Sequence, residues 1–260
     1  MYPDLVNIGF LHLHTYGACM AVGFFLCWTL VERLSGRKDI STFVMTLMLS
    51  GVVGGRAAYV VEHWSTQFAE RPFDVIRIDQ GGLMFYGGLI MAVIVFFAWC
   101  MAKREHPLPL ADLFCTVIPL GHASGRIGCF FYGCCYGRDS DAWCAVTFPK
   151  FSPSWHEHGQ RMVSVLPTQL FEAAALFALF AVLLLIYRRW RRHTAGVYLI
   201  CYAALRFGME YLRGDPRASV LGLSIWQAIS LCMALAGAAF VSVGMAAGCK
   251  PQPGKDTYDD

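Results

Sequence analysis

The sequence predicts an all-α integral membrane protein with about seven transmembrane helices and a small periplasmic head. Of its 260 residues, 57% are hydrophobic and only 15% are charged, whereas soluble domains carry about 25% charged residues. The mean hydropathy is +0.49, and seven segments reach the roughly 20 apolar residues that a helix needs to cross a bilayer. The alternating pattern of transmembrane strands, about 10 residues each, does not occur, so we expect the spans to be helical.

The seven predicted spans follow one another along most of the chain. They cover residues 10–31, 41–61, 83–102, 110–131, 168–187, 195–212 and 222–246. The fourth and sixth contain charged side chains and give the weakest signal. We expect residues 1–250 to form one membrane domain, with residues 132–166 as the head and residues 251–260 as a short cytoplasmic tail. The first eleven residues contain Asp4 and no Lys or Arg, so we do not expect a cleaved signal peptide.

Basic residues in the loops predict the orientation of these spans. If the N-terminus lies outside, the cytoplasmic loops hold 11 Lys and Arg residues and the outer segments hold 7, as expected if basic loops stay in the cytoplasm. Four arginines between residues 188 and 192 give most of this difference, and the C-terminus is then cytoplasmic. The net charge of +3 is slight and scattered, which argues against nucleic acid as a partner.

Three arginines lie within or at the ends of predicted spans, where a charge costs about 2.5–3.5 kcal/mol on insertion scales. The first, Arg56, either pairs with Glu62 or belongs to a functional site. Arg206 is followed by Glu210 and Arg213 at spacings of four and seven residues, so these three should share one helical face. Two arginines and one glutamate leave a surplus positive charge, which favours an anionic group such as a lipid phosphate.

Two segments are rich in glycine. Residues 121–137 contain five glycines together with Arg126 and three cysteines, and residues 81–88 contain four glycines around Tyr86. Glycine allows close backbone approach in membrane helices and tight turns after them. Such segments are either packing seams or parts of a site.

These motifs resemble those of the prolipoprotein diacylglyceryl transferase family, in the same order along nearly the whole chain. The similar segments are His14-Thr-Tyr16-Gly17, Gly54-Gly55-Arg56 with Tyr59, Gly81-Gly82-Leu-Met-Phe-Tyr86-Gly87-Gly88, Gly125-Arg126-Ile-Gly128, Pro167-Thr-Gln169-Leu-Phe-Glu172 and Arg206-x-x-x-Glu210-x-x-Arg213. The resemblance implies a transferase of the bacterial inner membrane that acts in lipoprotein maturation. Its substrates would be phosphatidylglycerol, which supplies the diacylglyceryl group, and a prolipoprotein, whose lipobox cysteine thiol accepts it.

The resemblance also implies roles for individual residues. Arg126 and Arg206 would hold the phosphate, Glu210 would orient an arginine, and Tyr16 would contact the lipid headgroup. The expected catalytic residues are Arg206, Arg126, Glu210, Tyr86, Cys129 and Cys134. The expected substrate-binding residues are Tyr16, His14, Arg56, Gly128, Gly87, Arg213 and Gln169. No cofactor is expected, because neither a P-loop nor a strand-borne Gly-x-Gly-x-x-Gly occurs.

The chain departs from the family pattern at two places. Tyr86 stands where the family has a histidine thought to serve catalysis, and a phenol with an ordinary pKa near 10 is a poor base at neutral pH. His122, one helical turn before Arg126, is either a substitute base or a packed membrane histidine. In the family's Gly-Asn-Phe-x-Asn-Gly-Glu signature, two Asn and the Glu are replaced here by Cys129, Tyr132 and Cys134.

The cysteine-rich segment allows several interpretations. A thiol beside an arginine can be a nucleophile, a redox centre or a metal ligand, or it can simply fill space. Zinc held by Cys129, Cys134, Cys135 and Cys144 with His156 or His158 matches no standard ligand spacing, so we assign no metal. The alternative functions are therefore a membrane thiol oxidoreductase or redox sensor that uses Cys129, Cys134 and Cys135, and a lipid transferase with another acceptor. An inactive lipid-binding protein is disfavoured, because it would not need all of the retained charged residues.

Overall fold

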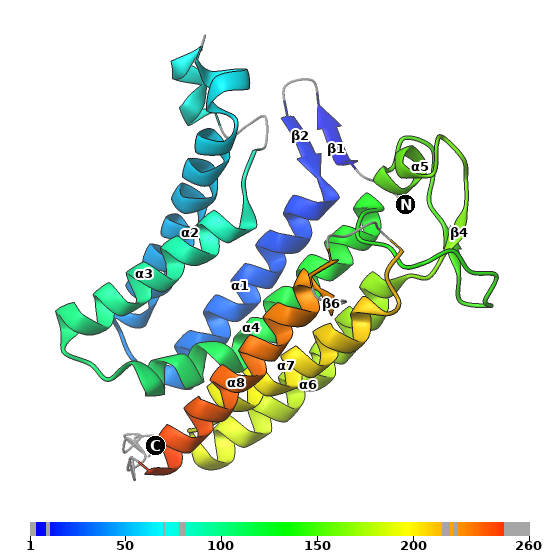
Figure 1. Ribbon diagram of the computed structural model, residues 1–260. Coiled ribbons are helices and arrows are strands. Elements are labelled where there is room, and N and C mark those ends of the chain that lie inside the picture. The colour runs from blue at the N-terminus through cyan, green and yellow to red at the C-terminus, as the bar shows by residue number, and fades with distance from the viewer. Residues whose placement is uncertain are drawn as a thin grey trace. The chain divides into compact units, whose positions relative to one another are not determined.

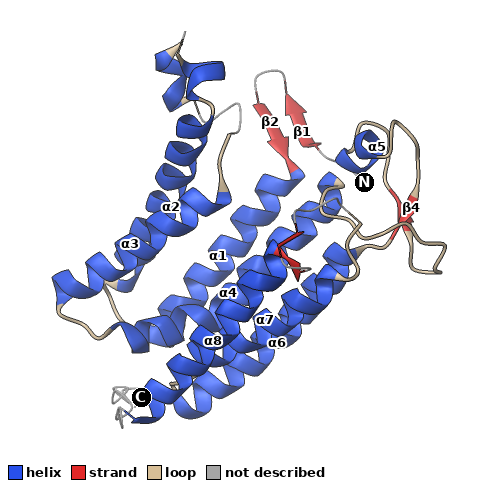
Figure 2. Cartoon of the chain, in the orientation of Figure 1, coloured by secondary structure: helices blue, strands red, loops and turns tan. Residues whose placement is uncertain are grey.

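All seven predicted spans form long helices in the computed structural model, which describes residues 4–8, 11–69, 71–77, 82–214, 219–220 and 223–246 (Figure 1). The helices are α1 (Thr15–Ser35), α2 (Ile40–Glu62), α3 (Phe85–Lys103), α4 (Pro107–Tyr132), α6 (Thr168–Trp190), α7 (Thr194–Glu210) and α8 (Ile225–Ala246). Figure 2 shows that helices make up most of the described chain.

The remaining elements are short. They are a π-helical turn η1 (Trp64–Phe68), a 3-10 turn η2 (Pro72–Ile76), helix α5 (Pro153–Glu157), and the strands β1 (Asp4–Ile8), β2 (Leu11–His14), β3 (Val146–Thr147), β4 (Ser164–Val165), β5 (Ser219–Val220) and β6 (Leu223–Ser224). The strands form three antiparallel pairs, β1 with β2, β3 with β4 and β5 with β6.

Among the described residues, five helices are long and apolar enough to cross a membrane, namely α1, α2, α3, α6 and α8. The protein is therefore an all-α membrane protein. The two helices outside this group, α4 and α7, are the two in which the sequence signal is weakest. They carry buried charged groups such as Asp112 and Arg206, and α7 has only 17 residues. Seven membrane crossings remain a prediction.

The start of the first span was predicted wrongly. Residues 11–14 are the strand β2, which pairs with β1 through Val6 opposite Leu13 and Ile8 opposite Leu11, and helix α1 begins at Thr15. The sequence Leu-His-Leu-His over residues 11–14 alternates apolar and polar side chains, which is the period of a strand rather than a helix.

The described chain forms two compact units, of which the smaller contains residues 32–107. Helices α2 and α3 lie side by side in it (Figure 1). A Cβ atom on Gly54 would lie 2.5 Å from the carbonyl oxygen of Gly87, so only glycine permits this approach.

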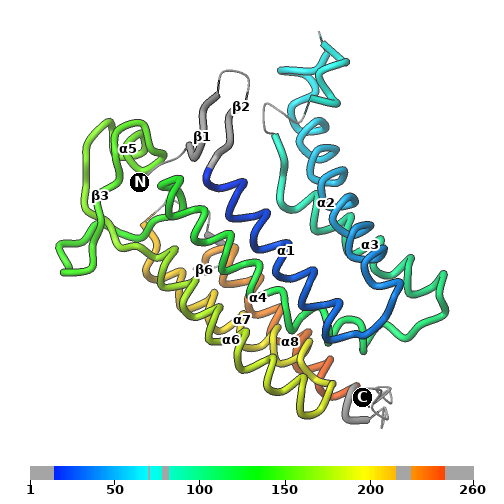
Figure 3. The backbone as a smooth tube through the Cα atoms, turned by 180° about the vertical axis from the view of Figure 1, so that it is seen from behind, coloured from blue at the N-terminus to red at the C-terminus, as the bar shows by residue number. Residues whose placement is uncertain are grey.

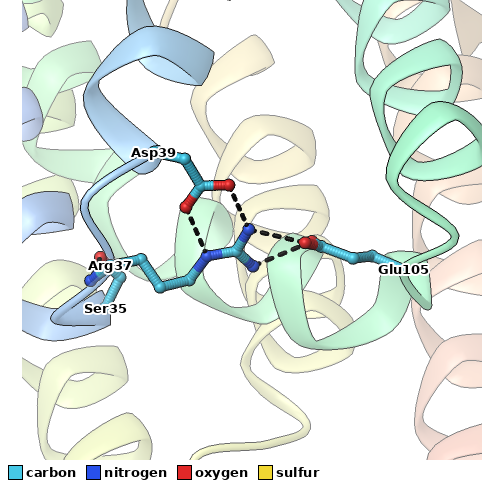
Figure 4. Close-up of polar contacts among 4 residues, drawn as sticks. All are labelled: Ser35, Arg37, Asp39 and Glu105. Carbon is cyan, nitrogen blue, oxygen red and sulfur yellow. Dashed lines mark hydrogen bonds and ion pairs between the residues drawn. The ribbon is translucent and has the colours of Figure 1, made fainter.

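A clamp of ionic groups joins the ends of α2 and α3 in this smaller unit. Arg37 donates to both carboxylate oxygens of Asp39 and to both of Glu105, with Nη2 2.8 Å from Asp39 Oδ2 and 2.6 Å from Glu105 Oε1 (Figure 4). The planar guanidinium matches two carboxylates in this way, which the point charge of a lysine does not. The clamp ties the turn before α2 to the turn after α3.

The larger unit contains residues 1–31 and 108–260. Figures 1 and 3 show α4, α6, α7 and α8 side by side along their lengths. Ala123, Ala173 and Leu176 form the buried centre between α4 and α6, with Tyr202 and Leu205 of α7 packed against them. Helix α1 packs on α4 without intervening side chains at Gly23, where an added Cβ would lie 2.6 Å from Ser124 Cβ.

Between α4 and α6 the chain forms the predicted head. Its buried centre consists of Tyr136, Phe148 and Val165, which join the segment after α4 to strands β3 and β4. The head lies at the end of the larger unit where α4 ends and α6 begins (Figure 1). Its position on the periplasmic side stays a prediction.

Candidate functional site

Helices α4 and α7 run in the same direction and contact each other near their starts and again further along. Near the start of α4, Asp112 Oδ1 accepts from the backbone N–H of Ala195 at 2.8 Å, and its main-chain oxygen accepts from Thr194 Oγ1 at 2.7 Å. This carboxylate caps the N-terminus of α7, whose first N–H groups have no partner within the helix. Further along, the ring of His122 lies 5.3 Å from that of Tyr202. These two contacts fix how the helices align.

The alignment places two arginines at the same level. The rings of His122 and Tyr202 are in contact. Arg126 follows His122 by one helical turn, and Arg206 follows Tyr202 by one helical turn, so the two arginines lie at a similar height on helices that run in the same direction. Their side chains are only 14% and 7% exposed. Two cations buried among apolar helices are expected to be paired or to serve a site.

Arg126 is paired with a carboxylate from α6. Its Nη2 lies 3.0 Å from Glu172 Oε1, an ion pair whose two atoms are not aligned as a hydrogen bond, and His122 Nε2 lies 3.7 Å from the same oxygen. Glu172 is only 1% exposed. Glu172 lies in one of the family-like motifs but was not among the expected site residues, although a carboxylate inside an apolar span is a usable signal.

Arg206 is paired within its own helix. Nη2 lies 2.8 Å from Glu210 Oε2, which agrees with the expectation that Glu210 orients an arginine. The guanidinium also lies 5.2 Å from the centre of the Trp226 ring of α8, a cation–π contact that sequence analysis did not anticipate.

Both arginines keep unused donors. Arg126 Nε and Arg206 Nη1 are buried and have no hydrogen-bond partner among the described residues, and the same holds for the acceptor Gln169 Oε1. An unpaired buried polar atom costs about 1–3 kcal/mol. Two such donors at one level of the bundle match an anionic oxygen-rich ligand.

Arg213 does not share the helical face predicted for it, because α7 ends at Glu210. Instead Arg213 lies in a bridge with Gly137, next to a hydrogen bond from Arg138 N–H to the Leu212 carbonyl at 2.9 Å. The prediction that Arg206, Glu210 and Arg213 share one helical face was therefore wrong. The bridge places Arg213 beside the cysteine-rich turn that follows α4.

That turn has an unusual backbone. Gly133 has φ of +80° and Cys135 has φ of +63°, the left-handed region that a non-glycine residue rarely adopts. Two buried side chains at the start of α6 hold the turn. Gln169 Nε2 donates to the Cys134 carbonyl at 2.8 Å, and Thr168 Oγ1 donates to the Cys135 carbonyl at 3.1 Å.

The turn gathers three thiols. The sulfur atoms of Cys129, Cys134 and Cys135 all lie within 4.8 Å of one another, and all three residues are free thiols. Cys144 is not a member of this group, so the wider cluster considered from the sequence is not formed. Hydrogen bonds from the thiols of Cys129 and Cys134, followed by the charge of Arg213, hold the pKa of Cys135 well below its ordinary value.

Two further predicted residues lie at this end of the larger unit. A Cβ atom on Gly128 would lie 3.0 Å from Cδ2 of Tyr16, so Tyr16 of α1 packs directly on α4 two residues beyond Arg126. Tyr16 is 41% exposed, which leaves its ring accessible to a ligand. The side chain of His14 lies outside the described residues.

The other predicted residues belong to the smaller unit. Arg56 donates to the carbonyls of Asp74 at 2.7 Å, Val75 at 2.8 Å and Gly82 at 3.2 Å, and among the described residues it does not pair with Glu62. It ties these three described residues between α2 and α3 to helix α2. Tyr86 is 45% exposed near the start of α3, and Gly87 packs on α2 as described above.

The fold and this site define a helical membrane protein with two buried arginine–carboxylate pairs and a thiol cluster at one end of a helix bundle. The profile of the family described as prolipoprotein diacylglyceryl transferase matches residues 3–243. The chain belongs to that family.

Individual relatives agree with this assignment. The chain is 31% identical to the phosphatidylglycerol–prolipoprotein diacylglyceryl transferase of Bordetella bronchiseptica, with 91% of this chain and 92% of the relative covered. It is 32% identical to the protein of the same name from Pseudoalteromonas translucida, with 90% of each covered. The corresponding protein from Clostridium tetani is also 32% identical, over 91% of this chain and 95% of the relative.

Proposed function

We propose that this protein transfers the diacylglyceryl group of phosphatidylglycerol to the lipobox cysteine thiol of a prolipoprotein. The names of its relatives contain the two substrates, phosphatidylglycerol and a prolipoprotein, and the diacylglyceryl group that is transferred. The observation that carries the proposal is the pair of buried guanidinium groups of Arg126 and Arg206, each with an unused donor atom. They supply positive charge where a lipid phosphate must bind and depart.

The reaction exchanges one bond for another. The sulfur of the acceptor forms a bond to the terminal glycerol carbon of the diacylglyceryl group, the bond from that carbon to the phosphate oxygen breaks, and glycerol phosphate leaves with the electron pair. The thiol must also lose its proton. Negative charge develops on the departing phosphate in the transition state. The N–H donors of the two arginines are already oriented in an apolar helix bundle, so they stabilise this transition state more than they stabilise the bound lipid before reaction.

The remaining residues have supporting roles in this proposal. Glu172 and Glu210 fix the orientation of the two arginines, and Arg213 and Gln169 provide further polar groups at the same end of the bundle. Tyr16 and Gly128 form the side toward α1, where the headgroup would bind. Cys129 and Cys134 stand where the family signature has an Asn and a Glu, next to the proposed phosphate-binding arginines. His14, Arg56, Tyr86 and Gly87 are assigned to substrate binding or catalysis from their motif positions.

The proposal includes a location. The protein would lie in the bacterial inner membrane with the N-terminus outside and the C-terminus in the cytoplasm, so that the head faces the periplasm. Support comes from the five apolar helices and from the four arginines at the end of α6, between residues 188 and 192.

The test uses purified protein in detergent with phosphatidylglycerol and a synthetic lipobox peptide, whose mass is followed under reducing conditions. Arg206→Ala should lower the rate by about 100-fold or more, the usual effect of removing one donor at a developing charge. Arg161→Ala, which removes an exposed arginine of the head, serves as the matched control and should keep the wild-type rate. Equal rates in all three proteins would contradict the proposed role of Arg206.

A further inference from the structure

The geometry of the thiol cluster matches a metal site. Zinc binds thiolate sulfur at about 2.3 Å in a tetrahedron, which places neighbouring sulfur atoms about 3.8 Å apart. The sulfur atoms of Cys129, Cys134 and Cys135 already lie within 4.8 Å of one another. A bound ion would require them to close by at most about 1 Å, within the reach of side-chain rotation.

The backbone that presents these thiols is fixed from outside the cluster. Cys135 holds a left-handed conformation, and such strain persists only where the surroundings impose it, commonly at functional sites. The surroundings here are Thr168 and Gln169, each 1% exposed, which donate to the two successive carbonyls of Cys135 and Cys134 in the turn. Thiols that only filled space in the core would not need a turn whose backbone is held by two buried side chains.

The charges around the cluster favour a metal–thiolate group. Three thiolates with one divalent cation carry a net charge of −1, and two arginines flank them. Arg126 precedes Cys129 by one turn of α4, and Arg213 lies in a bridge with Gly137, two residues after Cys135. Thiolates are soft ligands that select zinc and related ions over magnesium or calcium.

We propose that Cys129, Cys134 and Cys135 bind a thiophilic divalent cation such as Zn²⁺ and leave its fourth position for the acceptor thiol. Three protein ligands with one open position is the arrangement of catalytic zinc sites. This role rests on the proposed function. It answers the chemical question raised by Tyr86, because a thiol that binds the cation loses its proton to water and becomes a thiolate without a histidine base. Its sulfur then attacks the glycerol carbon while the phosphate leaves toward Arg126 and Arg206.

The first experiment measures metal binding by the purified full-length protein, independently of activity. After loading with Zn²⁺ and dialysis, the wild type should hold about one zinc ion per chain, and loading with Co²⁺ should give the absorption bands of a thiolate-bound ion. Single Cys→Ser variants at positions 129, 134 and 135 should bind zinc more than about 100-fold more weakly. Cys144→Ser, which removes a head thiol outside the cluster, should bind like the wild type.

Two results would overturn the metal site. One is a wild-type protein that binds no zinc. If that protein, isolated without reductant, also contains a disulfide within the cluster, the result would favour thiol redox chemistry instead. The other is unchanged zinc affinity in all three variants. Because the first result needs only the wild type, it does not depend on whether a variant folds.

The second experiment separates the role of the metal from the proposed function. Removing zinc with a chelator should lower peptide transfer by more than about 10-fold, and adding Zn²⁺ back should restore it. Full transfer by the metal-free protein would overturn the catalytic role and leave the proposed function standing. A zinc-loaded wild type that transfers nothing, beside an active family enzyme, would refute the proposed function and with it this role of the metal.

Discussion

A buried arginine is stable in these helices because a carboxylate accompanies it. Arg126 has Glu172, and Arg206 has Glu210. Removing one partner of a buried pair costs about 3–5 kcal/mol, since the other charge is left uncompensated. The pairs therefore keep both guanidinium groups charged and oriented, while Arg126 Nε and Arg206 Nη1 stay available. If every N–H group of the arginines were hydrogen-bonded, the pairs would have only a structural role. Because these two nitrogen atoms are unpaired among the described residues, each arginine can still bind an anionic ligand.

The histidine of the head gives a pH-dependent prediction. His158 Nδ1 lies 2.6 Å from the Ser154 carbonyl oxygen and Nε2 lies 3.0 Å from Asp139 Oδ1, so both ring nitrogens face acceptors and the protonated ring is satisfied. Burial lowers the pKa of His158, but these two hydrogen bonds outweigh it, and the pKa is raised above 6.5. The contribution of His158 to the stability of the head is then complete below the unfolded pKa and is lost as pH rises through the folded value.

Limited proteolysis measures this effect, because trypsin can cut the head at Arg138, Lys150 and Arg161 once it opens. Between about pH 5.5 and 8.5 the wild-type head should become easier to cut relative to a His158→Gln variant, which cannot titrate. Comparing the two at each pH cancels the pH dependence of trypsin itself. A constant ratio of cutting rates would show that the protonated ring does not stabilise the head.

At the scale of elements, glycine controls how closely α1 approaches α4. An alanine at Gly23 would place Cβ 2.6 Å from Ser124 Cβ and 3.3 Å from the Gly121 carbonyl oxygen. Neither neighbour is the end of a flexible side chain, so the helices must separate. Gly23→Ala should therefore cost about 1–3 kcal/mol, as overpacking does in other proteins, and should lower the unfolding temperature measured in detergent.

Gly17→Ala on the same helix is the matched control. No atom of the residues that the structure describes lies within 4 Å of its added Cβ, and alanine is favoured over glycine inside a helix by about 0.5–1 kcal/mol. This variant should be as stable as the wild type or slightly more so. If both substitutions had the same effect, close packing at Gly23 would not be what holds α1 on α4.

The sequence identifies helices more reliably than it identifies their ends or their contacts. Long, mainly apolar runs predict the seven long helices of the described residues, although only five of these helices are apolar enough to cross a membrane. The start of the first span and the helical face expected of Arg213 were wrong, because strand pairing and a bridge to Gly137 decide them. The cysteines were visible as a group, but their convergence depends on the left-handed Cys135 and on Gln169, 35 residues away. No local pattern contains that information.

At the scale of the whole molecule, one helix relates the head to the basic loop. Helix α6 begins at Thr168, which binds the cysteine turn, and it ends at Trp190 among four arginines. Its 23 residues span about 35 Å at 1.5 Å per residue, enough to cross the hydrocarbon core. The head and this basic loop should therefore lie on opposite sides of the membrane.

The positive-inside tendency then predicts which side is which. A fluorescent reporter that folds only in the cytoplasm should be active when fused after His193, and an alkaline phosphatase, active only outside, should be active after Gly214. Replacing Arg188, Arg189, Arg191 and Arg192 with asparagine should weaken this preference, because these residues supply most of the charge difference. The reverse pattern of reporter activity would place the thiol cluster and both buried arginines at the cytoplasmic face, where the acceptor would have to be a thiol that has not yet been exported.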